Sequence, residues 1–168
     1  MAEFLAQSVG RFVGGEITTR CALGKGGVRT AEDKIEGDGA TPLGVWPLRR
    51  VFYRPDRLDP PPTRLTTVPI EPSDGWCDAP GDPHYNRKVK LPYPASAERL
   101  WREDAVYDIV VELGYNDDPV VDRRGSAIFF HLIRGDYEPT EGCVALALPD
   151  MLAVLAKAAP GDALTVTA

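Results

Sequence analysis

A histidine and a cysteine lie close together near the C-terminal end of this 168-residue chain. His131 ends the apolar run at residues 127–130, and Cys143 follows Gly142 at the start of a second apolar run. The chain has two histidines and three cysteines, so few other pairs compete with this one. A thiol becomes a strong nucleophile as the thiolate, and a neighbouring imidazole is the usual group that takes its proton. The spacing therefore predicts a Cys–His pair for covalent catalysis.

The same residues also have structural and metal-binding interpretations. A cysteine after a glycine is most often a small core residue, and a histidine at a strand end is most often a hydrogen-bonded structural group. Zinc is the other alternative, since nitrogen and sulfur ligands are available at Cys77, His84, His131 and Cys143. No close ligand pair at the usual zinc spacing anchors such a set, so we expect no metal and no cofactor.

Further segments favour catalysis by resemblance. Residues 125–131 together with residues 139–146 resemble the catalytic core of the L,D-transpeptidase (YkuD) family. Residues 36–44 resemble the Thr-Pro-x-Gly segment on the substrate side of that family. Residues 75–78, 84–86 and 113–116 resemble a branch of the same family whose members are short. The resemblance implies one catalytic domain over residues 1–168. It also implies a mainly β fold with short helices (α+β), an L,D-transpeptidase-like β-sandwich or barrel that carries the Cys/His site.

Two positions depart from the family pattern. Glu141 stands where the family usually has histidine, and Ala145 stands where it usually has arginine or asparagine. A carboxylate beside the sulfur would raise the pKa of the thiol, because like charge opposes ionisation. We therefore expect the Glu141 side chain to point away from Cys143 or to hold a cationic group of the substrate.

The resemblance implies a thioester mechanism. Family members cleave the bond between the diamino acid and the terminal D-alanine of a peptidoglycan tetrapeptide stem. By that resemblance Cys143 attacks the carbonyl carbon, and His131, oriented by the Leu132 carbonyl, takes the thiol proton and passes it to the departing amine. Backbone N–H groups of Gly142 and Cys143, with Glu141, are the implied oxyanion donors.

Peptidoglycan stem peptides or muropeptides are the expected partners. The candidate substrate contacts are Tyr85, Asn86, Tyr115, Asn116, Arg134 and Thr140. If water accepts the stem from the thioester, the protein is an L,D-carboxypeptidase of muropeptide recycling. If an amine of a second stem accepts it, the protein is a cross-linking transpeptidase. An inactive stem-binding module is the third alternative. Residues 1–8 lack the basic and apolar regions of a secretory signal, which predicts a cytoplasmic hydrolase, or a periplasmic protein if a leader was removed.

Composition excludes several other classes. A net charge of −6 and a pI near 4.9 argue against nucleic acid as a partner, which requires basic patches. No apolar stretch reaches the length of a membrane span. Three widely spaced cysteines do not form a disulfide framework. We expect Cys21 in the core and Cys77 half-exposed in a loop.

Short runs punctuated by sixteen glycines and sixteen prolines predict a β-rich fold. The expected strands are residues 16–23, 44–52, 107–113, 126–131 and 163–167. Ser96 is expected to cap a short helix through residue 101, and Asp150 to open a helix that ends before Pro160. Residues 54–96 hold ten of the prolines. So long a segment without regular periodicity is usually a functional loop, and we call it the proline-rich excursion.

Overall fold

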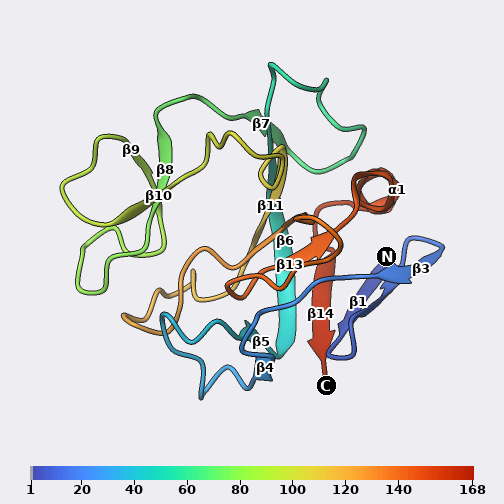
Figure 1. Ribbon diagram of the computed structural model, residues 1–168, viewed down its shortest axis with the longest axis horizontal. Coiled ribbons are helices and arrows are strands. Elements are labelled where there is room, and N and C mark those ends of the chain that lie inside the picture. Colours follow the sequence, from blue (N-terminus) through green and yellow to red (C-terminus); the bar gives the residue numbers. More distant parts are fainter. Residues whose placement is uncertain (1) are drawn as a thin grey trace.

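The structure, a computed structural model, describes residues 2–168 and is built mainly from β-strands (Figure 1). Nine of the strands form the main sheet. Along this sheet they follow in the order β13 (Val144–Leu146), β12 (Phe129–Leu132), β11 (Ile109–Leu113), β6 (Gly44–Tyr53), β14 (Ala163–Thr167), β1 (Glu3–Gln7), β2 (Arg11–Gly14) and β3 (Ile17–Arg20), with β7 (Thr67–Pro69) paired to β6. The mainly β class expected from the sequence is confirmed.

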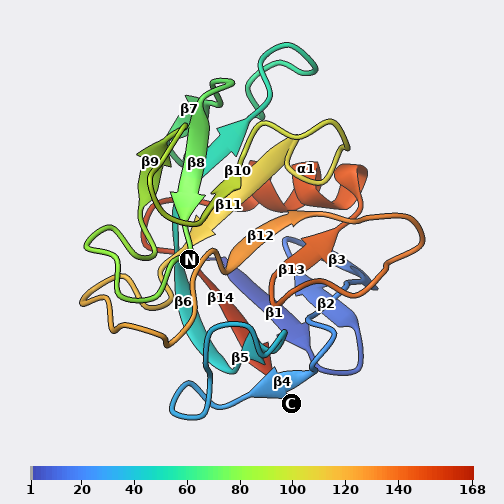
Figure 2. The same cartoon turned by 60° about the vertical axis from the view of Figure 1, so that its left-hand side comes forward.

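The two ends of the main sheet meet, so that it curls into a nearly closed barrel (Figure 2). Ala22, just after β3, pairs with Ala145 of β13, and the two N–H···O hydrogen bonds between them measure 2.9 and 3.0 Å. Closure satisfies backbone groups that a free sheet edge would leave unpaired. Because Ala145 lies close after Cys143, the seam of the barrel runs beside the candidate nucleophile.

The first strand, β1, is absent from the sequence-based prediction. It runs parallel to β14 and antiparallel to β2. Phe4 and Ala6 are buried and alternate with the more exposed Glu3 and Gln7. So short an alternation is a weak signal by itself, because its burial depends on β14 at the other end of the chain.

The other predicted strands are present with shifted bounds. Residues 44–52 and 163–167 form β6 and β14, and residues 16–23 contribute the shorter β3. The strands predicted at residues 107–113 and 126–131 begin later than expected, β11 at Ile109 and β12 at Phe129. The delay before β12 has a local cause, since Ala127 has a φ of 52°, in the left-handed region that breaks a strand.

The proline-rich excursion and the three residues just after Ser96 build a second, smaller sheet. It contains β10 (Ala97–Arg99), β8 (Asp74–Cys77) and β9 (Lys88–Lys90), in that order, and stands to the left of the main sheet in Figure 1. The helix predicted from Ser96 is therefore wrong, because residues 97–99 pair with β8 and tertiary pairing overrides local propensity. The predicted half-exposure of Cys77 is also wrong, since β8 buries it completely.

The described residues contain one α-helix, α1 (Leu148–Lys157). It begins before Asp150 because Pro149 fits the first helical turn, where its missing N–H is not needed. Asp150 therefore does not cap the helix, and its carboxylate accepts a hydrogen bond from Thr19 at 2.9 Å. Met151, Val154 and Leu155 pack into the main core. None of the helical structure in residues 2–168 is long and apolar enough to cross a membrane.

The two faces of β12 serve two different cores. Phe130 and Leu132 point into the barrel core with Phe4, Phe12 and Cys21, whose predicted core position is confirmed. Phe129 points to the opposite side and joins a second cluster between the main sheet and the smaller sheet. Successive strand residues alternate between faces, so His131 also lies on the Phe129 side. A short remaining pair of strands, β4 (Val28–Arg29) and β5 (Thr41–Pro42), lies beside the loop that approaches Gly142.

Candidate active site

The Cys143 thiol is held by the backbone of the segment that enters β12. The N–H of Phe129 donates to Sγ at 3.2 Å, and the thiol donates to the carbonyl oxygen of Ala127 at 3.2 Å. The residue is only 6% exposed. These two contacts fix the sulfur at the bend that precedes β12.

The bend itself is supported by Asn86. Its side-chain oxygen accepts hydrogen bonds from the Ala127 N–H at 3.1 Å and from the Trp76 indole at 2.9 Å. Its amide nitrogen donates to the carbonyl oxygens of Tyr115 and Asn116, at 3.2 and 2.7 Å. A left-handed alanine costs free energy and persists only where its surroundings hold it. Asn86 therefore supports the backbone that carries the thiol contacts.

His131 lies on β12 with one ring nitrogen fixed. Nδ1 is 2.8 Å from the carbonyl oxygen of Leu132, and because a carbonyl only accepts, Nδ1 carries the proton. This is the contact that the family resemblance implies. In the neutral ring Nε2 then keeps its lone pair. Parallel pairing of β12 with β13 places Phe129, His131 and Cys143 toward the same side of the sheet.

The pair is uncharged at rest. Burial raises the pKa of the Cys143 thiol to about 12, and burial lowers the pKa of His131 to about 4. At neutral pH the site therefore holds a thiol and a neutral imidazole, so a proton must move to the imidazole as the sulfur attacks.

Both residues line one cavity of about 380 Å³. The smaller sheet and the loop before β11 supply Asp78, Glu98, Arg102 and Tyr107, and the loop between β4 and β5 supplies Lys34, Glu36 and Gly37. Cavities of this size hold small ligands or the ends of peptides. The arrangement offers a nucleophile and a base to a ligand that enters from solvent.

Over residues 8–166 the chain matches the family model of the L,D-transpeptidase catalytic domain, YkuD. The chain belongs to this family. A search of curated proteins gives no match. L,D-transpeptidases of this family depend on a cysteine and act on peptidoglycan.

The family's glycine before the cysteine is required here by space. Gly142 has a φ of 135°, and a Cβ at this position would come within 2.8 Å of the Ala40 carbonyl oxygen. Thr140 braces the same turn, because its hydroxyl donates to the Cys143 carbonyl at 2.6 Å and accepts from the Gly142 N–H at 3.1 Å. The Gly142 N–H must leave Thr140 before it can serve an oxyanion, so its role as an oxyanion donor stays a prediction.

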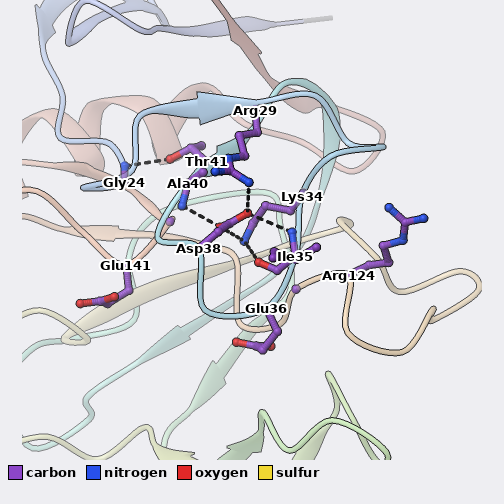
Figure 3. Close-up of polar contacts among 12 residues, drawn as sticks. Gly24, Arg29, Lys34, Ile35, Glu36, Asp38, Ala40, Thr41, Arg124 and Glu141 are labelled. Carbon is purple, nitrogen blue, oxygen red and sulfur yellow. Dashed lines mark hydrogen bonds and ion pairs between the residues drawn. The ribbon is translucent and has the colours of Figure 1, made fainter.

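Glu141 departs from the L,D-transpeptidase pattern and faces a lysine. Its carboxylate binds the Lys25 ammonium at 2.9 Å, and its side chain is 80% exposed. In Figure 3 it lies apart from the buried polar contacts of the neighbouring loop. Ala145, the other departure, is completely buried and closes the barrel through its backbone.

Sequence analysis missed a buried ion pair beside this site. Lys34 is 2% exposed in its side chain and donates to Asp38 at 2.7 Å and to the Ile35 carbonyl at 3.0 Å (Figure 3). Asp38 also accepts from the N–H groups of Ile35 and Ala40, and these hydrogen bonds hold the pKa of its carboxyl below the usual range. The pair fixes the loop that ends at Ala40, against which Gly142 packs. Nothing in residue type or spacing predicts that Lys34 is buried.

The predicted substrate contacts divide into two groups. Arg134 and Thr140 line the cavity, together with Glu141. Tyr85, Asn86, Tyr115 and Asn116 do not line it, and their polar groups bind the protein. The Tyr85 hydroxyl donates to Glu36 at 2.7 Å, and the Tyr115 hydroxyl donates to the Arg124 carbonyl at 2.5 Å. Asn116 binds Val121 and Gly125. These four side chains serve loop architecture in the structure, and their contact with a substrate stays a prediction.

The four zinc-ligand candidates do not form a cluster. Cys77 and His84 both contact Asp82 in the excursion, whereas His131 and Cys143 lie in the cavity. Across the part of the chain that the structure describes, no three histidine, cysteine, aspartate or glutamate residues are placed to hold a metal ion. Metal-independent activity stays a prediction.

The buried imidazole predicts a loss of stability in acid. The pKa of His131 falls from 6.5 to about 4 in the folded chain, so between these values the unfolded state binds a proton that the folded state refuses. The free energy of unfolding should therefore fall as pH drops from 6.5 toward 4, with a share from His131 on the order of 3 kcal/mol. Urea denaturation at pH 7 and pH 4.5 measures this loss.

His131→Gln should lose less stability over that pH interval than the wild type. Carboxyl groups with a lowered pKa, such as that of Asp38, also reduce the free energy of unfolding in acid, and they do so equally in wild type and His131→Gln. His84→Gln is the matched control, because the His84 side chain is 63% exposed. Equal acid losses in wild type and His131→Gln would contradict a buried neutral imidazole.

Proposed function

We propose that the protein is an L,D-carboxypeptidase that releases the terminal D-alanine of peptidoglycan tetrapeptide stems, with Cys143 as nucleophile and His131 as base. One observation carries the proposal. The thiol and the imidazole line the same cavity, and the imidazole is fixed through Nδ1 so that Nε2 is available to take a proton.

The chemistry runs through an acyl-enzyme. Sγ bonds to the carbonyl carbon before D-alanine while its proton passes to Nε2 of His131. The C–N bond then breaks, the imidazolium returns the proton to the departing amine, and the stem stays on Cys143 as a thioester. Water attacks this thioester, His131 takes a proton from the water, and the thiol is regenerated as the shortened stem leaves. A neutral resting pair suits this sequence because each half-reaction begins with an imidazole able to accept a proton.

The cavities favour water over a second peptide as the acceptor. The cavity of about 380 Å³ contains Cys143 and His131, whereas neither residue lines the two other main cavities described for residues 2–168. A cross-linking enzyme must hold a peptide amine against the thioester and keep water out. An adjoining cavity of about 470 Å³ shares Ile128 with the first but is lined by neither Cys143 nor His131, so a small acceptor that enters beside the donor stem is the better fit. The cytoplasmic location expected from the sequence stays a prediction.

The test is a competition between acceptors. Purified enzyme is incubated with a tetrapeptide stem, alone and with a millimolar amine acceptor. The products are identified and quantified by mass spectrometry. We expect free tripeptide and D-alanine to dominate in both reactions. Dominance of a stem–amine adduct would assign the protein to cross-linking, and binding of the stem without any product would assign it to stem recognition. A Cys143→Ser enzyme serves as the control for spontaneous hydrolysis.

A further inference from the structure

A carboxyl group from the smaller sheet reaches into the candidate active site. Glu98 lies in β10, lines the cavity and accepts a hydrogen bond from the Tyr107 hydroxyl. Tyr107 is buried and stands just before β11. The mechanism above uses neither residue, although both share the cavity with Cys143 and His131.

The Tyr107 ring contacts His131 directly and is linked to Cys143 through Phe129. It packs edge-on against the His131 imidazole, with ring centroids 5.3 Å apart and planes at 68°. It also packs edge-on against Phe129, at 5.9 Å and 77°. Phe129 is the residue whose N–H donates to the Cys143 sulfur. A shift of the Tyr107 ring would therefore reach the base directly and the nucleophile through Phe129.

The smaller sheet holds Glu98 firmly in this position. Glu98 pairs with Trp76 across β10 and β8, and the Trp76 ring packs edge-on against Phe129 at 5.0 Å. The Arg102 guanidinium lies 5.3 Å from the centre of the Tyr107 ring. The same guanidinium forms an ion pair with the Asp104 carboxylate at 2.7 Å. The proline-rich excursion thus packs directly on the strand that bears the site.

We propose that Glu98 is a positioning residue for the Cys143–His131 pair: it anchors the Tyr107 hydroxyl, and the anchored ring fixes the imidazole and the Phe129 backbone that holds the sulfur. The proposal rests on the roles assigned to Cys143 and His131 above. It gives the smaller sheet a function in the reaction itself.

The charge of Glu98 should also reach the thiol. Tyr107 and His131 line the cavity with Cys143, and the charges of Glu98, Lys34 and the more exposed Glu141 act on the thiol. Five further charged groups line the same cavity: Glu36, Asp78, Arg102, Arg134 and Glu138. Glu98 and Glu141 oppose ionisation of the thiol and Lys34 favours it, with Glu98 the strongest of these charges. The groups facing His131 are Arg102, Arg134 and Asp104. Burial raises the pKa of the Glu98 carboxyl itself, so its negative charge is most complete at alkaline pH. Removing that charge should lower the pKa of the thiol.

Two substitutions separate anchoring from charge. Glu98→Gln keeps an acceptor for the Tyr107 hydroxyl and removes the charge, whereas Glu98→Ala removes both. We expect Glu98→Ala to lower kcat about tenfold or more with little change in KM, because misplaced groups slow the chemical step. We expect Glu98→Gln to recover most of kcat. Glu103→Gln, an exposed carboxyl in the same segment, is the matched control.

The second measurement needs no substrate. Alkylation of the full-length protein by iodoacetamide is followed from pH 7 to pH 10, and modification of the Cys143 peptide is quantified by mass spectrometry. Glu98→Gln and Glu98→Ala should both alkylate faster than wild type at a given pH, on the order of threefold, since each lowers the thiol pKa. Urea denaturation of each variant separates this effect from local opening of the buried site, because a Glu98→Gln protein as stable as wild type that alkylates faster has a changed thiol.

The outcomes are distinct. Wild-type kcat in Glu98→Ala, or a Glu98→Gln alkylation profile that overlays the wild type, would overturn the proposal. If Glu98→Ala fails to fold, as judged by circular dichroism, the Glu98→Gln profile still decides the charge effect. If wild type shows no turnover on stem peptides, the proposed function fails while the alkylation series continues to test Glu98.

Discussion

Cys143→Ser is expected to abolish release of D-alanine while leaving the fold intact. A serine hydroxyl can accept from the Phe129 N–H and donate to the Ala127 carbonyl as the thiol does. It is a much weaker nucleophile, because the imidazole must remove a proton from an alcohol in place of a thiol. Turnover is measured by mass spectrometry on a tetrapeptide stem, and the fold by circular dichroism and urea denaturation.

Cys143→Ala should be equally inactive but less stable. It leaves the buried Phe129 N–H without its partner, which costs about 1–2 kcal/mol of unfolding free energy. Cys77→Ser is the matched control, since Cys77 is also buried and its sulfur contacts Asp82 at 3.6 Å, outside the cavity. Activity that survives in Cys143→Ser and disappears in Cys77→Ser would move the nucleophile to Cys77.

His131→Ala should lower turnover by a factor on the order of 10²–10⁴ near neutral pH, the usual worth of a positioned general base. The remaining thiol has a pKa of about 12 and is almost wholly protonated under these conditions. Part of the lost rate should return as pH rises, because hydroxide then ionises the thiol without the imidazole. The measurement is kcat/KM from pH 7 to pH 10.

The control for this series is His84→Ala, whose side chain is exposed and contacts Tyr93 at 3.0 Å. It should keep the wild-type rate and profile. A folded His131→Ala enzyme whose rate stays flat with rising pH would argue that His131 does not act as the base. Circular dichroism at each pH shows whether the variant remains folded.

Local patterns predicted the parts of the site that local structure determines. His131 and Cys143 stand on or beside apolar runs that form β12 and β13, so their placement follows from neighbouring residues. The Leu132 contact was implied by the family resemblance, and the structure contains it. The role of Asn86 does not follow in this way. Its partners include Ala127, a residue distant in sequence, and loop polarity made it look like a substrate contact.

The same distinction explains the errors in the fold. Residues 163–167 were predicted as a strand, but the partner of β14, strand β1, gains its burial from the far end of the chain. Residues 97–99 look helical until β8 is placed beside them. By residue type Lys34 is expected at the surface, but in the structure its buried ammonium donates to Asp38 and to the Ile35 carbonyl. In each case a partner distant in sequence or a loop closure decides the structure.

The closed seam between Ala22 and Ala145 has a consequence for how the protein acquires its activity. The first strand, β1, pairs with the last, β14, and the seam joins residue 22 to a strand more than a hundred residues later. Such high contact order slows folding to the millisecond-to-second range typical of β-barrels. During synthesis the thiol emerges before β14 does, so the nascent chain carries a cysteine without its finished cavity. We therefore expect the cavity around Cys143 and His131 to be complete only after the barrel has closed.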